Sequence, residues 1–132
     1  MAALCARMTD IVNNTGVVVE IREVEQGDDD GKGKLVAKLQ KGDRTVIRGM
    51  KFLDRMAYLG PRSIHVTAIL ATGTTKFILK AQDFATYGRL VFRLDKQVLA
   101  VDLEEMSGIR RMRPVRFLAS VWANHRNGRR GS

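Results

Sequence analysis

The pattern of apolar and polar residues predicts a series of short elements over the first part of the chain. Residues 3–12, "ALCARMTDIV", can form a short helix, which "NNTG" would end. Residues 17–25, "VVVEIREVE", alternate β-branched and charged positions and predict a strand. A polar turn at residues 27–33 leads to the returning strand of a hairpin at residues 34–41, and "RTVIRG" can add a short third strand.

A helical period follows this strand-rich block. The apolar positions that define it are Met50, Leu53, Met56, Ala57 and Leu59. Gly60 and Pro61 are expected to end the helix. Four strand-like runs come next, "SIHVTAIL", "TTKFILKA", "GRLVFRLDK" and "QVLAVDL", and the loop "QDFATY" separates the second from the third. We expect these runs to form an antiparallel meander.

The final predicted element is a C-terminal amphipathic helix that begins near Pro114, a residue suited to a first helical turn. Its apolar stripe would consist of Val115, Leu118, Val121 and Trp122. Residues 126–132 are expected to form a flexible basic tail. Strand-rich blocks that each end in a helix predict an α+β fold with antiparallel sheets, and a chain of 132 residues predicts a single domain over residues 1–132.

Two nearly matching stretches indicate that the chain contains a duplicated unit. "GKLVAKLQK" begins at Gly33, and "GRLVFRLDK" begins at Gly88. Each follows a strand and a polar loop, and each precedes a further strand and an amphipathic helix. Agreement at several levels predicts approximate repeats at residues 17–60 and 63–125, each a strands-then-helix unit.

The faces of the two matched strands predict what the repeats do. Because side chains alternate across a strand, Lys34 and Lys38 are expected to share one face, as are Arg89 and Arg93 in the second copy. The leucines between them would face the core. Cations four residues apart on a strand lie roughly 13 Å from each other, so both can follow an extended polyanion.

Aromatic residues near these cations point to single-stranded nucleic acid. Basic strands with aromatic platforms suit single strands, because every base has a face to stack and every nucleotide has a phosphate. Tyr87 and Phe84, in a polar loop, are the better stacking candidates, whereas Phe77 on the paired strand is expected in the core.

The positive charge is concentrated near the C-terminus. The net charge is +9, yet every acidic residue lies at or before Glu105, and the cations after that position are all arginines. These arginines are Arg110, Arg111, Arg113, Arg116, Arg126, Arg129 and Arg130. A guanidinium presents a rigid fork of donors that suits phosphate, so we expect a polyanionic partner. The alternative is a solvated basic tail that only keeps the protein soluble.

Catalytic and metal-binding patterns are weak in this sequence. Neither His65 nor His125 has a ligand or triad partner at a recognisable spacing, and "GDDDGKGK" matches neither a phosphate loop nor a calcium loop. The acidic cluster of Asp102, Glu104 and Glu105 is expected to favour the dipole of the final helix. We therefore expect no enzyme activity, no metal, no cofactor and no small-molecule substrate.

The sequence also predicts a location inside a cell or a virion. No apolar run approaches the roughly 18 residues of a membrane helix, and the apolar stretch in "MAALCARM" is too short for a secretory signal. The single cysteine, Cys5, excludes an internal disulfide, which suits a reducing compartment. We expect a protein of the cytoplasm, an organelle matrix or a virion interior, with no membrane partner.

The order of elements and two short motifs resemble the superfamily that includes the Whirly proteins, the Pur-alpha proteins and the kinetoplast guide-RNA-binding proteins. "YGRLVFRLDK" follows "AQDFAT" much as a glycine and a basic residue open a strand in Pur-alpha-type repeats, and "YLGPRS" is similar to a segment between the halves of Whirly proteins. The resemblance implies an oligomer that binds single-stranded DNA or RNA on a sheet surface. It carries over to Lys34, Lys38, Arg89, Arg93 and Tyr87.

Two functions follow from these features. The first is a nucleic-acid-binding protein that prefers single-stranded RNA or DNA and uses the sheet cations and the C-terminal arginines. The second is a viral or ribonucleoprotein assembly protein that forms homo-oligomers and contacts RNA.

Overall fold

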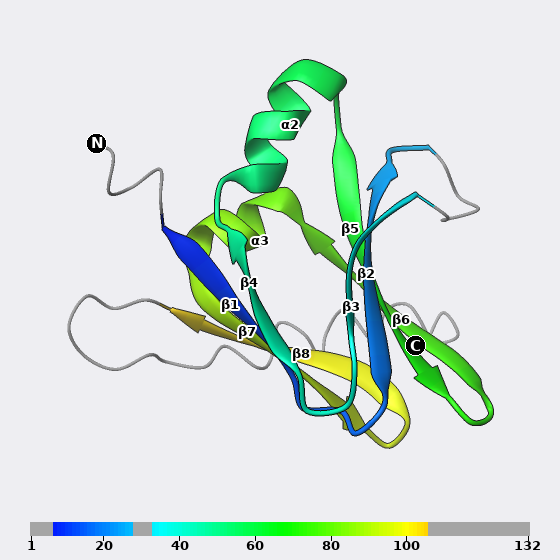
Figure 1. Cartoon of the computed structure of the whole chain (residues 1–132). Helices are drawn as coiled ribbons and strands as arrows, with labels where there is room; N and C mark the ends of the chain where they lie inside the picture. The colour runs from blue at the N-terminus through cyan, green and yellow to red at the C-terminus, as the bar shows by residue number, and fades with distance from the viewer. Residues whose placement is uncertain (1–6, 28–32, 106–132) are drawn as a thin grey trace.

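The described part of the chain, residues 7–27 and 33–105 of this computed structural model, consists of strands with two helices between them (Figure 1). The strands are β1 (Met8–Asn13), β2 (Val18–Glu25), β3 (Lys34–Leu39), β4 (Arg44–Arg48), β5 (Arg62–Leu70), β6 (Gly73–Lys80), β7 (Tyr87–Asp95) and β8 (Val98–Glu105). The helices are α2 (Lys51–Leu59), between β4 and β5, and α3 (Ala81–Thr86), between β6 and β7.

The strands form two four-stranded sheets. Sheet A has the order β4-β1-β7-β8, and sheet B has the order β3-β2-β5-β6. The paired strands are antiparallel except for β1 and β7, which run parallel. The predicted α+β class with mainly antiparallel sheets is therefore confirmed.

The inner faces of the two sheets share one apolar core. Fully buried side chains from both sheets belong to it: Ile11, Leu90, Phe92 and Val101 from sheet A, and Val19, Ile21, Ile64 and Val66 from sheet B. Figure 1 shows α2 and α3 together at one end of the sheets. There the rings of Phe52 and Phe84 meet edge to face, with centroids 4.9 Å apart and planes at 68°. Such aromatic pairs contribute about 1 kcal/mol beyond the area they bury, which joins the two helices over the core.

The predicted helix over residues 3–12 is wrong where the structure describes it, because Met8–Asn13 is strand β1. Two of its inner side chains, Thr9 and Asn13, are polar, so the segment lacks the apolar alternation of a typical strand. Backbone carbonyls satisfy both of them. Oγ1 of Thr9 donates to the Phe84 carbonyl at 2.6 Å, and Nδ2 of Asn13 donates to two carbonyls at 2.8 and 2.9 Å. Hydrogen bonding therefore permits polar residues at inner positions of this strand.

The predicted hairpin of β2 and β3 is confirmed, and the strand after it changes sheets. β3 pairs antiparallel with β2, whereas β4, from the "RTVIRG" segment, pairs with β1 in sheet A. A tight turn lies between β3 and β4, in which the Asp43 N–H donates to the Gln40 carbonyl at 3.0 Å. The two strands thus follow one another in the chain but belong to different sheets.

The predicted helix is confirmed as α2, but its most buried residue does not belong to the predicted apolar stripe. It begins after Met50 and ends before Gly60, whose φ of +90° is a left-handed conformation that favours glycine at a helix end. The fully buried side chain is Phe52, which lies outside the predicted apolar stripe. Leu59 of that stripe is exposed. Leu53 and Met56 of the stripe are partly buried against the core, so the helix contacts the core through its first two turns.

The last four strands form two separate pairs, so the predicted single meander is wrong. β5 pairs with β6 in sheet B, and β7 pairs with β8 in sheet A. The segment between the pairs, predicted as a loop, is the short helix α3. The carboxylate of Asp83 in its first turn accepts a hydrogen bond from the Lys80 N–H at 2.8 Å, which stabilises the start of the helix.

The two matched stretches occupy different positions in the sheets. β3 is an edge strand of sheet B, whereas β7 is an inner strand of sheet A, between β1 and β8. The repeats at residues 17–60 and 63–125 therefore stay a prediction. The closing helix predicted from Pro114 and the tail at residues 126–132 lie outside the described residues.

Candidate functional site

The two β7 arginines lie on the outer face of sheet A, and both are ion-paired. Nε of Arg89 lies 3.2 Å from an Asp10 oxygen, and its Nη1 lies 3.3 Å from a Glu104 oxygen. Nε of Arg93 donates to both Asp102 oxygens, at 3.1 and 3.2 Å. Asp102 and Glu104 thus belong to β8 and hold arginines, instead of lying at the start of a helix as expected. A phosphate would have to compete with these carboxylates for either arginine.

The prediction that Lys34 and Lys38 share a face is wrong. The pairing of β2 with β3 contains a β-bulge, which shifts the register by one residue. Lys38 lies opposite Glu20 on the outer face of sheet B, whereas Lys34 lies opposite the buried Glu23. Leu35, expected in the core, is 44% exposed for the same reason. A one-residue shift exchanges the two faces of a strand, so the first copy presents no two-lysine face.

The aromatic candidates contribute to the core. Phe84 is fully buried, so it is not a stacking residue, and Phe77 is buried as predicted. Tyr87 is partly buried and packs against the same core cluster. The seven C-terminal arginines and His125 lie outside the described residues.

Arginines and lysines differ in their partners across the described residues. Each ion pair there uses an arginine, and the arginines concerned are Arg22, Arg44, Arg48, Arg55, Arg62, Arg89 and Arg93. By contrast, no lysine within residues 33–105 lies within 4.0 Å of a carboxylate oxygen, although the Lys80 charge acts on Asp83 at longer range. These lysines are the cations whose charge is most available to a polyanion.

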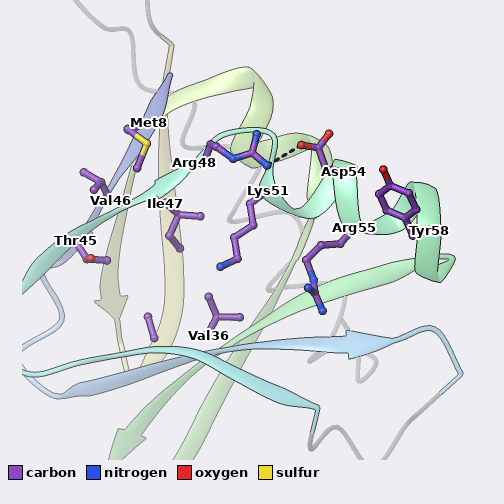
Figure 2. Close-up of a pocket in the computed structure, with 11 residues that line it drawn as sticks. Met8, Val36, Thr45, Val46, Ile47, Arg48, Lys51, Asp54, Arg55 and Tyr58 are labelled. Atoms are coloured by element: carbon purple, nitrogen blue, oxygen red, sulfur yellow. Dashed lines mark hydrogen bonds and ion pairs between the residues drawn. The ribbon is translucent and has the colours of Figure 1, made fainter. Parts of the chain in front are cut away.

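A pocket of about 580 Å³ lies between β3, β4 and α2 (Figure 2). β3 and β4 are the edge strands of their sheets, so the two sheets are not joined on this side. Val36 of β3 and Ile47 of β4 line opposite walls, and Lys51 and Arg55 extend into the space from α2. Volumes of about 300–1,000 Å³ are typical of sites that take a small ligand, so this pocket is large enough to hold one.

The cations around the pocket are not equivalent. Nη2 of Arg48 lies 2.7 Å from an Asp54 oxygen, and Nε of Arg55 donates to both oxygens of Glu23, at 2.8 and 3.0 Å. Lys51 has no carboxylate partner among the described residues. It is therefore the lining cation whose charge is not offset.

The pocket residues of α2 were not predicted from the sequence. Lys51, Arg55 and Tyr58 recur at i, i+4 and i+7, a spacing that places them on one side of a helix. This spacing indicates that the three side chains share one side of the helix. It does not show that β3 and β4 lie opposite that side of α2. Tyr58 is 86% exposed at the margin of the pocket, unusually high for an aromatic residue.

Other chemistry in the described residues is limited. His65 is buried in β5, with its Nε2 3.3 Å from Oγ of Ser63. Within residues 7–27 and 33–105, no group of three or more His, Cys, Asp or Glu side chains is arranged to hold a metal ion. No helix in the same ranges has the length and apolar character needed to cross a membrane.

In comparisons with known proteins, the chain matches no protein-family model, no curated protein and no solved structure. Arguments about its function therefore rest on the geometry and charge of the site itself.

Proposed function

We propose that this chain is a nucleic-acid-binding protein that prefers single-stranded RNA or DNA, performs no catalysis and acts in the interior of a cell, organelle or virion. The observation that carries the proposal is the contrast between paired arginines and unpaired lysines. An arginine already paired with a carboxylate attracts a phosphate less, because the neighbouring negative charge offsets its own. An unpaired lysine neutralises a phosphate and releases its counterion without that offset.

Several unpaired lysines lie on the segments that border the pocket. Lys34 and Lys38 belong to β3, Lys41 follows it, and Lys51 begins α2. The exposed ring of Tyr58 lies at the margin of the same pocket and gives an unpaired base a surface to stack on. Bases inside a duplex are already stacked, so this combination favours single strands.

The C-terminal arginines would supply further attraction. They carry seven of the nine net positive charges of the chain, and arginine suits phosphate oxygens through its fork of donors. Binding on a sheet surface, as the resemblance to the Whirly and Pur-alpha superfamily implies, would use Arg89 and Arg93. Their carboxylate partners make that surface the weaker route.

Titration with fluorescently labelled oligonucleotides tests the proposal. The full chain would be titrated with single- and double-stranded RNA and DNA at about 50 mM and about 200 mM salt. We expect the tightest binding with single strands and a log affinity that falls linearly with log salt concentration. Absence of binding at low salt would exclude the function, and equal affinity for duplexes would exclude the single-strand preference.

A second candidate is a viral or ribonucleoprotein assembly protein that forms homo-oligomers and contacts RNA. The observation that favours it is the set of exposed apolar side chains on the elements around the pocket: Met8, Leu35, Val46, Met50, Tyr58 and Leu59. Apolar groups gathered on a surface mark interaction sites, and unpaired strand edges can pair with another chain. Sedimentation velocity would support assembly if it detects a dimer or larger species, and a monomer at every concentration would exclude it.

A further inference from the structure

We propose that the pocket between β3, β4 and α2 holds one nucleotide of the bound strand, with Lys51 at a phosphate and Tyr58 against the base of a neighbouring nucleotide. This inference rests on the proposed function and names the site at which that function is carried out. It moves the contact surface from the outward-facing cations of β3 and β7, which the sequence predicted, to the pocket bordered by the edge strands β3 and β4.

The walls of the pocket suit the flat faces of a base. Val36 is partly buried and packs against the core, and Ile47 is buried. These side chains offer apolar contact on two sides of a space of about 580 Å³. A hydrated ion would gain nothing from apolar walls, whereas a base would bury its faces there.

Lys51 has no evident role in stabilising the fold. It forms no ion pair with a described carboxylate. It also occupies the first position of α2, where a cation is unfavourable because the helix dipole places partial positive charge at that end. A phosphate beside Lys51 would offset the charge of the lysine and the partial positive charge at the start of the helix.

The other two cations that line the pocket, Arg48 and Arg55, are ion-paired. Arg55 is held by the buried Glu23, so its side chain does not need to reorganise when a ligand arrives, and Arg48 is paired with Asp54 at the surface. The carboxylates of both pairs are already engaged by guanidinium groups, which reduces their repulsion of a phosphate.

Tyr58 lies at the opposite end of the helix from Lys51 (Figure 2). Seven residues of α-helix correspond to about 10 Å along the axis, so the two side chains can hold separate parts of one strand. The ring is 86% exposed, and the fold gains little from its apolar surface. Stacking on a base would bury that surface.

A β-strand from another protein is the competing occupant of the pocket, because the free edges of β3 and β4 could pair with it. Edge pairing uses backbone groups, so it gives no role to the unpaired charge of Lys51. Nucleic acid accounts for both the charge and the exposed ring, and the observations therefore favour it.

Four variants of the full chain test the inference with a labelled single-stranded oligonucleotide. They are Lys51→Ala, Tyr58→Ala, Tyr58→Phe and the control Lys76→Ala. Lys76 is an exposed lysine without an ion pair on β6, at the opposite edge of sheet B from β3. The control therefore removes the same charge as Lys51→Ala at a site away from the pocket.

The expected results differ between the variants. Lys51→Ala should weaken binding about 5- to 10-fold at low salt and reduce the salt slope by about 0.7, the value for one phosphate on a single strand. Tyr58→Ala should weaken binding about 10-fold, whereas Tyr58→Phe, which keeps the ring, should stay within about 2-fold of wild type. Lys76→Ala should also stay within about 2-fold, because it removes only long-range attraction.

The outcomes separate the pocket from the function. If wild type binds and the Lys51→Ala and Tyr58→Ala variants match the control, the pocket inference is overturned and the proposed function stands. If wild type does not bind, both fail. If wild type does not bind nucleic acid but self-associates, and Tyr58→Ala abolishes this self-association, the occupant of the pocket is another copy of the chain. Circular dichroism checks that each variant folds. If Tyr58→Ala does not fold, the result for Lys51→Ala alone decides whether the pocket inference stands.

Discussion

Nε of Arg55 donates hydrogen bonds to both carboxylate oxygens of Glu23, which joins α2 to β2. The Glu23 side chain is only 1% exposed, and Nε of Arg62 lies 3.5 Å from one of its oxygens. A carboxylate buried to this degree needs charged partners to offset its lost hydration. The same pair fixes Arg55 beside the pocket, where Lys51 has no described carboxylate partner.

Glu23→Gln should lower the free energy of unfolding by about 2–3 kcal/mol, because Arg62 would keep its charge in a largely buried position with only the exposed Glu25 as its partner. Arg55 is partly exposed and can turn toward water, which limits the loss. Urea unfolding of both proteins measures the difference. Glu25→Gln is a matched control, because Glu25 also contacts Arg62, at 3.4 Å, but is 70% exposed. The control should lose less than about 0.5 kcal/mol, and equal losses would contradict the role given to Glu23.

Gly33→Ala should destabilise the fold by about 2 kcal/mol or more, because the substitution combines strain with a collision. The φ of Gly33 is +53°, and an added Cβ would collide with the Glu23 carbonyl and lie 2.8 Å from Cγ2 of Val24. Gly42→Ala isolates the strain, since Gly42 has a φ of +79° and nothing within 4 Å of an added Cβ. Thermal unfolding should show a loss of about 1 kcal/mol for the control. A Gly33 variant no less stable than the Gly42 variant would refute this close approach.

Asp83 should make stability depend on pH in an unusual direction for a carboxylate. Burial raises the pKa of the Asp83 carboxyl, although the Lys80 N–H and the Lys80 charge partly oppose the shift. Because the folded pKa exceeds the unfolded one, the favourable contribution is complete below the unfolded pKa and is lost as pH rises through the folded pKa. Asn keeps an acceptor for the Lys80 N–H and does not titrate, so wild type should gain stability relative to Asp83→Asn as pH falls.

Urea unfolding of wild type and the Asp83→Asn variant from about pH 7 to about pH 3 measures this change. A stability difference that does not vary with pH would show that the carboxyl titrates normally. Asp83→Ala serves as the control for the hydrogen bond and should lose about 1 kcal/mol at neutral pH.

Strands could be predicted where the local pattern alone determines them. β2 alternates apolar and charged residues, and β5 and β6 are rich in β-branched residues, so their extended conformation follows from short stretches. β1 could not be predicted in this way, because Thr9 and Asn13 face inward and depend on carbonyls distant in the chain. The partners of β4 and β7 likewise depend on contacts that no local pattern contains.

The candidate site was less predictable than the fold for the same reason. Arg89 appears free in the sequence, but its partner Asp10 lies 79 residues earlier in the chain. The bulge that separates Lys34 from Lys38 depends on pairing with β2. The relation of Lys51 to the pocket depends on β3 and β4 belonging to different sheets. Composition could therefore indicate a polyanionic partner without locating its contacts.

Amide chemical-shift mapping of the isotope-labelled full chain, titrated with an unlabelled single-stranded oligonucleotide, tests the central claim most directly. The pocket predicts the largest shifts at Val36, Ile47, Lys51, Arg55 and Tyr58, with little change on β6. Shifts concentrated on the outer face of sheet A around Arg89 and Arg93, with the pocket unchanged, would contradict it.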